Sequence, residues 1–390
     1  MTGLWLKRKA LVPVALLWAL GLFPAAAGAA PTLPFGEALR LQLSTTPTLL
    51  DYELPGHPSR VGVGHVGVVM DGALLWSYEP RVQVLLGVRA RLPFAFDLGT
   101  EAAALPVFAL ILKPFGEATT LRFGTLDHRH GFHPALLDEA RYNYGRPLEE
   151  TYNRSLRPEG YRDIQDLAIG AENGGQFIFH TEHIHAEAYL EWQLLETLEH
   201  REKFAVGVLA EYRHRWVQAG FQYRLVHYGG QKFTQADPIR RQALDNRRQP
   251  TSLALTLNVH PLDLGWLKVS LPAAFVHGRA IQTPGDRERV HYGFEAGAQA
   301  KLFEMVTLGY KIWLPKGGQA KDLSEDGEPV YSGPRAHRAQ LGLLQKIGPA
   351  TVSGRLDLIF AKGSDKVQYL TVTTVQLAWE HLLFSDSPLP

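Results

Sequence analysis

Cysteine is absent from all 390 residues of the chain. A disulfide framework, a thiolate metal site and a covalent haem attachment motif are therefore excluded. Charge of one sign is not in excess either: the formal net charge is +1, or 1 − 3 = −2 without the three basic residues near the N-terminus. A nearly neutral chain gives no electrostatic reason to expect a nucleic-acid partner. A fold without disulfides must be held together by hydrogen bonding and burial.

Long hydrophobic runs are missing after residue 30. No segment there approaches the roughly 18 consecutive apolar residues that mark a transmembrane helix. The first 30 residues differ, because a basic start (residues 7–9) precedes an apolar run (10–23) and a stretch of small residues (25–30). This order is typical of a secretory signal peptide, here with cleavage after Ala29. We therefore predict that residues 1–29 direct export through the inner membrane and are removed.

Alternation of apolar and polar residues is the clearest pattern present, and residues 290–314 carry it best. The apolar positions are Val290, Tyr292, Phe294, Ala296, Ala298, Ala300, Leu302, Val306, Leu308, Tyr310, Ile312 and Leu314. A two-residue period indicates strands with two different faces. The apolar face has the length of a strand that crosses a bilayer at a tilt, roughly 9 to 11 residues. The pattern predicts one hairpin of a transmembrane barrel, turning at residues 303–304.

Similar stretches recur along the chain and predict about sixteen antiparallel strands, within a range of roughly 14 to 18. Two short ones, residues 61–70 and 73–78, are separated by Asp71 and Gly72, a dipeptide typical of hairpin turns.

The connections between these stretches alternate in length over the second half of the chain. Short connections are predicted at residues 213–215, 260–264, 303–304 and 347–349, and long ones at 227–250, 278–289 and 315–334. An up-and-down barrel has this alternation, with short turns in the periplasm and long loops outside. A soluble Greek-key sandwich does not produce that order.

The signal peptide, the alternating strands and the uneven connections resemble the Gram-negative outer-membrane porin class over the whole mature chain. The resemblance implies an all-β, up-and-down antiparallel transmembrane barrel located in the outer membrane. It also implies outer-membrane lipid, lipopolysaccharide and the barrel-assembly machinery as partners. Residues 376–384 end on an aromatic residue, as do the strands that this machinery reads, although a short tail (385–390) follows.

The expected organisation has four parts: a signal peptide (1–29), a periplasmic lead-in segment (30–59), the barrel (60–384) and the C-terminal tail (385–390). Residues 30–59 are placed outside the barrel because prolines, including Pro47, interrupt their strand-like pattern.

The long insert at residues 127–167 carries charges of both signs and several tyrosines. Long loops in compact folds are usually functional. We expect it to fold into or over the lumen as a constriction, where opposed charges orient polar solutes; an external loop with a solvated surface is the alternative. The pore-lining candidates are Arg141, Tyr142, Tyr144, Arg146, Glu149, Glu150, Arg154, Arg157, Glu187, Glu191, Arg224, Glu295, Lys301, Lys311, Arg355 and Asp357.

Two groups of histidines could bind a metal. His128, His130 and His133 lie in the insert, and His183 and His185 lie near Glu187, a spacing at which imidazole and carboxylate bind zinc or copper. Turns and polar barrel interiors collect such residues without a metal, so we expect neither a metal nor a cofactor. No G-x-S-x-G or H-E-x-x-H motif is present. We therefore predict no catalytic residue and no enzymatic activity.

Together these features predict an outer-membrane channel for the passive passage of hydrophilic solutes. Export of a carbohydrate or polysaccharide is a variant, and it would need periplasmic partners. The alternatives are an outer-membrane barrel enzyme or a non-conducting structural barrel, with a soluble periplasmic β-sandwich ranked below them.

Overall fold

A computed structural model gives the fold of the chain. The residues it describes are 38–53, 63–93, 103–127, 130–137, 173–194, 203–228, 251–280, 289–317, 329–332, 334–347, 350–362 and 368–385. The predicted signal peptide (1–29) and most of the predicted tail (385–390) lie outside these residues, as do the insert candidates from Arg141 to Arg157.

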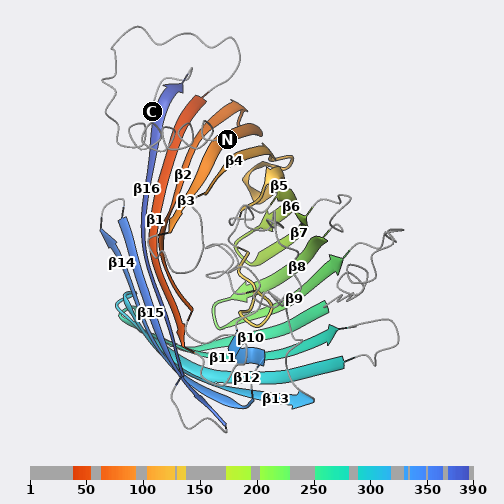
Figure 1. The fold of residues 1–390 in the computed structure, drawn as a ribbon, viewed down its shortest axis with the longest axis vertical. Helices are drawn as coiled ribbons and strands as arrows, with labels where there is room; N and C mark the ends of the chain where they lie inside the picture. The colour runs from red at the N-terminus through yellow and green to blue at the C-terminus, as the bar shows by residue number, and fades with distance from the viewer. Residues whose placement is uncertain are drawn as a thin grey trace, which may run out of the picture.

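The described residues form sixteen β-strands that close into a barrel (Figure 1). In chain order they are β1 (Ala38–Glu53), β2 (Val63–Glu79), β3 (Val82–Pro93), β4 (Ala103–Leu112), β5 (Thr119–Thr125), β6 (Asn173–His180), β7 (Ile184–Leu194), β8 (Lys203–His214), β9 (Val217–Tyr228), β10 (Thr251–Asp263), β11 (Leu267–Ala280), β12 (Arg289–Leu302), β13 (Val306–Gly317), β14 (Ala336–Ile347), β15 (Ala350–Ala361) and β16 (Gln368–Ser385). Each strand pairs with its sequence neighbours, and β1 pairs antiparallel with β16. The predicted all-β, up-and-down, sixteen-stranded fold is confirmed.

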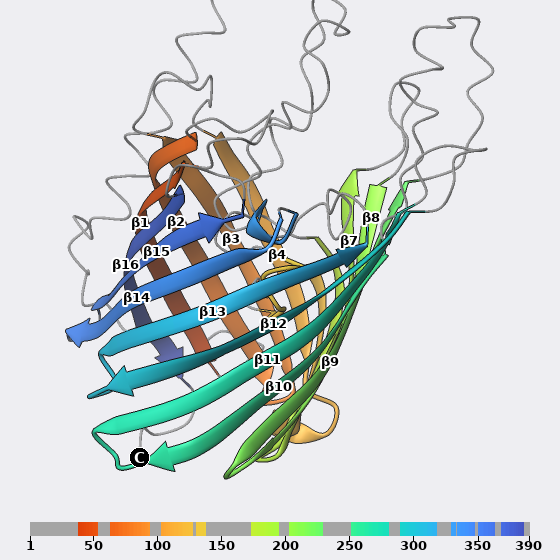
Figure 2. The same cartoon turned by 90° about the horizontal axis from the view of Figure 1, so that it is seen from below.

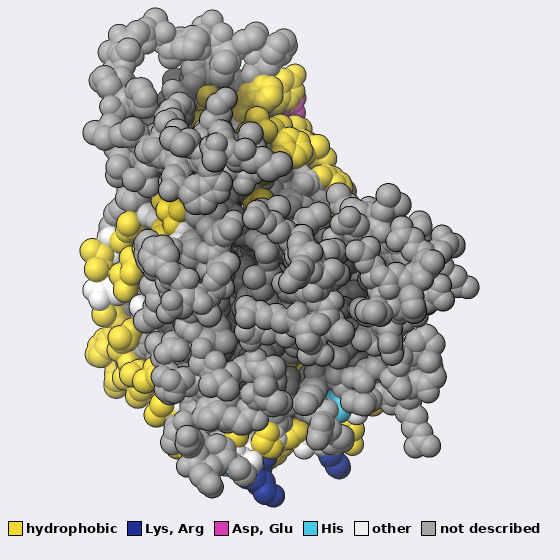
Figure 3. Space-filling model, viewed as in Figure 1, with side chains coloured by type: hydrophobic (Ala, Val, Ile, Leu, Met, Phe, Trp, Pro, Cys, Tyr) yellow, Lys and Arg dark blue, Asp and Glu magenta, His cyan; other side chains and the backbone are white. Residues whose placement is uncertain are grey.

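The outer face of the wall is apolar, and its inner face carries buried charged and polar residues together with some apolar ones. On β12 and β13, Phe294, Leu308 and Tyr310 are 46 to 49% exposed, whereas Glu295 and Trp313, on the opposite face, are 3 to 4% exposed. Hydrophobic side chains follow the outer edge of the described wall (Figure 3). An outward apolar band around a polar interior is the arrangement of a barrel solvated by lipid. Among the described residues, no helix is long and apolar enough to cross a membrane.

Tight turns join the strands at one end of the barrel (Figure 2). Between β12 and β13, Phe303 and Glu304 have φ angles of 50° and 59°. Positive φ at both central residues defines a type I′ turn, whose twist matches that of the flanking strands. The ring of Phe303 lies 6.0 Å from that of Trp266, in the next turn along the same rim. Aromatic side chains at this level belong to the interfacial girdle of a membrane barrel.

The predicted lead-in segment (30–59) is wrong for residues 38–53, because these form β1 and close the barrel. Pro47 suggested a break in the strand, since proline lacks a backbone N–H. In β1 it sits opposite Val68 of β2, while the pairing with β16 skips from Thr45 to Thr48. The strand tolerates the proline because the ladder on its β16 side is interrupted there.

The predicted turn at Asp71 and Gly72 is also wrong. Residues 61–70 and 73–78 are not two strands, because β2 runs without interruption from Val63 to Glu79. The Asp71 carboxylate accepts hydrogen bonds from Arg89 at 2.5 Å and from Ser44 at 3.2 Å, on the neighbouring strands β3 and β1. Its cross-strand partners therefore stabilise an extended conformation in place of the turn.

A hydrophobic core lies inside the barrel. It joins residues between β5 and β6 to the short helix η5 (Pro329–Ser332), which lies between β13 and β14, and to inward side chains of the wall. Its members are Leu126, Phe132, Ala135, Leu136, Leu137, Tyr189, Leu209, Ala254, Ala274, Val276, Trp313, Tyr331, Ala336 and Ile359. Part of the lumen is therefore filled by packed protein.

Candidate functional site

The candidate site is built on residues 130–137, which we call the in-folded segment. His130, Phe132, His133 and Leu136 are all less than 9% exposed. The segment closes on itself through hydrogen bonds from the backbone N–H of Leu136 and of Leu137 to the carbonyl of His133, at 2.8 and 3.2 Å. It is thus an ordered turn, packed into the core inside the barrel.

The pairing of β5 with β4 ends at Gly124, one residue before β5 itself ends and the chain continues toward the in-folded segment. Gly124 has a φ of +105°, and a Cβ there would lie 2.2 Å from the carbonyl oxygen of Phe108 on β4. Only glycine combines this backbone conformation with such a close approach. Gly124 therefore allows β5 to separate from β4 at this point while it stays paired with β6.

Two glutamine side chains of the wall hydrogen-bond to the backbone of residues 127–133, in place of the backbone partners of a regular strand. Gln176 on β6 accepts from the N–H of Asp127 at 2.8 Å and donates to the carbonyl of Asp127 at 3.1 Å. Gln222 on β9 accepts from the N–H of His133 at 2.6 Å and donates to the carbonyl of Gly131 at 3.4 Å. A carboxamide has both a donor and an acceptor, so it can satisfy an irregular backbone away from water.

His130 forms a buried pair with Glu187 of β7. Its Nδ1 contacts the Glu187 Oε1 atom, and Gln176 donates a second hydrogen bond to the same oxygen at 2.9 Å. The imidazole also stacks on the ring of Tyr189, with 4.3 Å between centroids. Gly207 makes room for that ring, because a Cβ at this position would lie 2.1 Å from Tyr189. The wall therefore fixes the orientation of His130 through both of its neighbours on β7.

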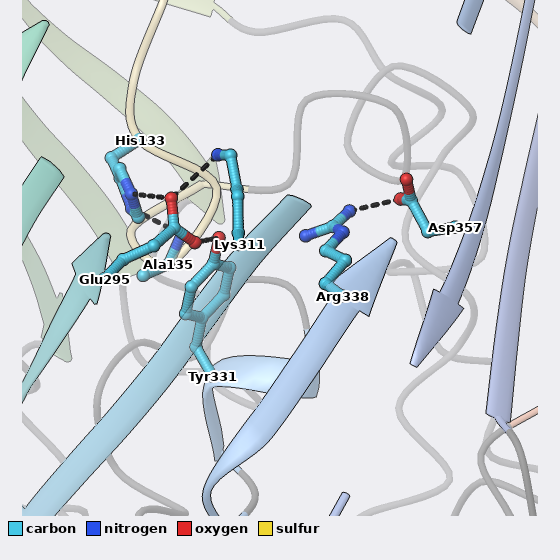
Figure 4. Close-up of polar contacts among 7 residues, drawn as sticks. All are labelled: His133, Ala135, Glu295, Lys311, Tyr331, Arg338 and Asp357. Atoms are coloured by element: carbon cyan, nitrogen blue, oxygen red, sulfur yellow. Dashed lines mark hydrogen bonds and ion pairs between the residues drawn. The ribbon is translucent and has the colours of Figure 1, made fainter. Parts of the chain in front are cut away.

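Glu295 of β12 is the second centre of charge (Figure 4). It accepts a hydrogen bond from Lys311 Nζ on β13 at 2.7 Å and one from the hydroxyl of Tyr331 in η5, and His133 Nε2 lies 3.5 Å away. A carboxylate buried to this degree is stable only with such partners. Glu295 thus connects two strands, η5 and the in-folded segment.

Asp357 of β15 forms a separate ion-paired group nearby (Figure 4). Its Oδ2 contacts a terminal nitrogen of Arg338 on β14 and lies 3.1 Å from the Arg355 Nε atom. Asp357 is completely buried, and Arg338 almost so. Two guanidinium groups and one carboxylate thus lie together on the inner face of the adjacent strands β14 and β15.

The predicted pore-lining residues of the strands fall into two sets. Glu187, Glu191, Arg224, Glu295 and Asp357 are buried on the inner face. Lys311 and Arg355 are partly exposed beside them, and Lys301 lies at the rim, 2.5 Å from Glu304 in the β12–β13 turn. The inward orientation of these side chains agrees with the alternation, whereas their role in a channel stays a prediction.

Sequence reasoning missed the residues that hold the site together, namely Gln176, Gln222 and Tyr331. The two glutamines occupy ordinary inward positions of their strands. The alternation therefore predicts that they point into the barrel, but it does not predict which groups they bind. The spacing of His130 and His133 was a usable signal, and the structure places each beside a carboxylate.

The weak metal candidates do not come together. His183 lies at the β6–β7 turn, with its ring 6.4 Å from those of both Tyr212 and His214, whereas Glu187 contacts His130 inside the barrel. His185 lies beside His180, with 5.6 Å between the ring centroids. Within the described ranges, no group of three or more potential ligands is placed to hold a metal ion.

The closed barrel, its apolar exterior and its polar interior define the class as an outer-membrane β-barrel. Residues 38–246, which are 209 of 390, match the lipid A 3'-O-deacylase-type family. The chain belongs to this family. A deacylase is an enzyme, so this match overturns the expectation that the chain has no enzymatic activity. The prediction failed because it relied on short linear motifs, whereas residues of a barrel site are spread over distant strands. A comparison with curated proteins gave no match.

The chain was also compared with solved structures. An anion-selective porin from Comamonas acidovorans superposes with a TM-score of 0.52 at 10% identity, covering 87% of this chain and all of the porin. OccK2 (OpdF) from Pseudomonas aeruginosa gives a TM-score of 0.48 at 11% identity, covering 89% of this chain and all of that one. At such low identity the similarity to the Comamonas porin supports the fold alone.

Proposed function

We propose that the chain is an outer-membrane enzyme that hydrolyses an O-linked acyl ester of lipid A. The family match carries the proposal, because it spans β1 to β9 and includes the in-folded segment with the His130–Glu187 pair. In this reaction a water oxygen bonds to the acyl carbon and the ester C–O bond breaks. The products are a fatty acid and a sugar hydroxyl, and no redox partner is needed.

His130 has the surroundings of a general base. Donation from Nδ1 to the Glu187 carboxylate makes Nε2 the nitrogen that takes up a proton, and the negative charge stabilises the imidazolium that forms. Gln176 and Tyr189 restrict both partners. Because the imidazole is about 1% exposed, the acyl ester has to enter the lumen, and the in-folded segment has to move, for the reaction to occur.

The test is the mass of lipid A after incubation with the purified, refolded barrel. Wild type should release one fatty acid per lipid A, with the matching mass loss, and His130→Gln should be slower by about two to four orders of magnitude, as expected for loss of a general base. His337→Gln is the control, because its ring contacts Tyr310 on the outer face of the wall, and this variant should keep wild-type activity. Folded wild type that leaves lipid A intact contradicts the proposal.

Passage of hydrophilic solutes is a second candidate, supported by the size of the barrel. Closed barrels of about 16 strands can enclose an aqueous channel, whereas about 8 strands are filled by side chains. The buried charges and the in-folded segment would then narrow this channel, and a carbohydrate is one class of solute that fits a polar lumen. Planar-bilayer recordings test this: deletion of residues 141–162 should change conductance and ion selectivity, and unchanged values contradict a constriction there.

A further inference from the structure

A row of basic and aromatic side chains lies on the outer surface of β11, β12 and β13. His277 on β11 is opposite Tyr292 on β12, and Tyr292 is opposite Lys316 on β13. Arg279 lies two residues beyond His277 and is opposite Val290. We call His277, Arg279, Tyr292 and Lys316 the basic row. It crosses three neighbouring strands at the end opposite the tight turns.

The basic row faces outward. Its members share the strand faces of Val290, Phe294 and Leu314, which are 41 to 49% exposed. Arg279 and Lys316 are themselves exposed, and His277 and Tyr292 are half-buried. Because successive side chains of a strand point to opposite faces, these four residues are on the lipid side of the wall and not in the lumen.

An apolar surface lies directly below the basic row, toward the middle of the strands. The ring of Phe275 is 5.1 Å from that of Phe294 and 6.3 Å from that of Tyr292. Leu314 and Leu271 are exposed on the same face. Two residues along a strand correspond to about 7 Å. The cations therefore lie at the upper border of the apolar band, one step above a cluster of aromatic rings.

Lys316 and the lysines at the tight-turn end of these strands have different surroundings. At the tight-turn end, Lys268 and Lys301 lie 2.7 and 2.5 Å from the two carboxylate oxygens of Glu304, so the protein neutralises its own charges. Lys316, at the other end, forms no ion pair with any described residue. At the border of a lipid-facing band, the Lys316 ammonium can reach an anionic headgroup at the membrane surface.

We propose that the basic row binds the phosphorylated sugar headgroup of lipid A in the outer leaflet, with the acyl chains lying over Phe275, Phe294 and Leu314. Phosphate oxygens are strong acceptors for lysine and arginine, and the rings and aliphatic side chains below match acyl chains in polarity. The long connections at this end place it outside the cell. The site goes beyond the proposed hydrolysis, because β11 to β13 lie outside residues 38–246 and binding there needs no catalysis.

The experiment compares lipid A binding by the refolded barrel and its variants, using native mass spectrometry in a neutral detergent. Replacing two cations by Arg279→Gln and Lys316→Gln should weaken binding by roughly 10- to 30-fold, given the contribution of each basic residue near an anionic lipid surface. The matched control is Lys268→Gln with Lys301→Gln, which removes the same charge at the tight-turn end and should leave the affinity unchanged. Heat-modifiable migration in gels verifies that every variant is folded.

Two lipids identify what the basic row recognises. Lipid A without its phosphates should bind weakly, and equally to wild type and the double variant. Phosphatidylglycerol should bind more weakly than lipid A, because it lacks the phosphorylated sugar. Equal affinity of wild type and the Arg279/Lys316 variant for lipid A overturns the proposal, as does phosphatidylglycerol binding as tight as that of lipid A. Fatty acid release is measured separately, so failure of the proposed hydrolysis is distinguishable from failure of this site.

Discussion

At the scale of single residues, Glu295 shows how the inside of the barrel tolerates charge. The carboxylate is removed from water, and Lys311, Tyr331 and His133 replace the solvent around it. These partners come from β13, η5 and the in-folded segment, so one side chain connects elements far apart in the sequence. If one charged member of such a buried group is removed, the opposite charge stays buried without its counter-charge.

Glu295→Gln should therefore lower the free energy of unfolding by about 3 to 5 kcal/mol, the usual cost of breaking a buried ion pair. Urea unfolding of the refolded barrel, followed by tryptophan fluorescence, measures the change. The matched control is Glu304→Gln in the turn of the same hairpin, where the carboxylate is exposed and its ion pairs contribute little. Equal destabilisation by both substitutions would mean that burial does not determine the effect.

The ionisation of Glu304 should make the stability of the barrel depend on pH. Hydrogen bonds from Lys268 and then Lys301 lower the pKa of the Glu304 carboxyl from 4.5 to about 2. Because the folded-state pKa is lowered, its contribution to stability is complete above about pH 4.5 and is lost as the pH falls toward 2. Carbon NMR titration of labelled glutamate should show this low midpoint. In the Lys268→Gln, Lys301→Gln variant the midpoint should rise, and an unchanged midpoint would exclude the lysines as its cause.

At the scale of elements, the in-folded segment depends on wall side chains that act as backbone partners. Gln222→Leu should leave the backbone N–H of His133 without its acceptor, a loss of about 1 to 3 kcal/mol for a buried donor. Amide hydrogen exchange should therefore speed up in residues 130–137 and stay unchanged in β12 and β13. Gln218→Leu on the same face of β9, where the amide contacts Glu211 at 3.1 Å, is the control. Exchange that rises equally in both variants contradicts the assigned role.

The elements differ in how far their sequence predicts them. β12 and β13 follow from alternation alone, since lipid and lumen impose opposite polarity on the two faces. β1 does not, because Pro47 breaks the local pattern and only its partners β2 and β16 make the strand. The predicted number of sixteen strands was right because two errors cancelled: the sequence analysis left β1 out of the barrel and counted β2 as two strands. The sequence singled out the carboxylates of the candidate site as pore-lining residues and its histidines as possible metal ligands. Their pairing with each other, and the roles of Gln176 and Gln222, depend on tertiary contacts that the sequence does not show.

At the scale of the whole molecule, the barrel has apolar surfaces in two places, facing lipid and packed inside. The inner core lies where the in-folded segment and η5 meet the wall, and the charged groups surround it. The overall fold is similar to that of the Comamonas porin, whereas residues 38–246 match a family of enzymes. A barrel wall of this kind is a general scaffold, so the proposed activity has to be tested at the groups inside it and not inferred from the fold.

The barrel closes only through β1, which pairs with both β2 and β16. Residues 38–53 should therefore be needed for folding. Deleting residues 31–53 removes β1 and leaves facing edges of β2 and β16 without hydrogen-bond partners, which lipid cannot provide. Refolding into detergent micelles should then give little or no heat-modifiable barrel. Deleting residues 31–37 alone is the control, since it leaves every paired residue of β1 in place, and its folded yield should match wild type. A normal yield after the longer deletion would show that β1 is dispensable and would restore the lead-in assignment.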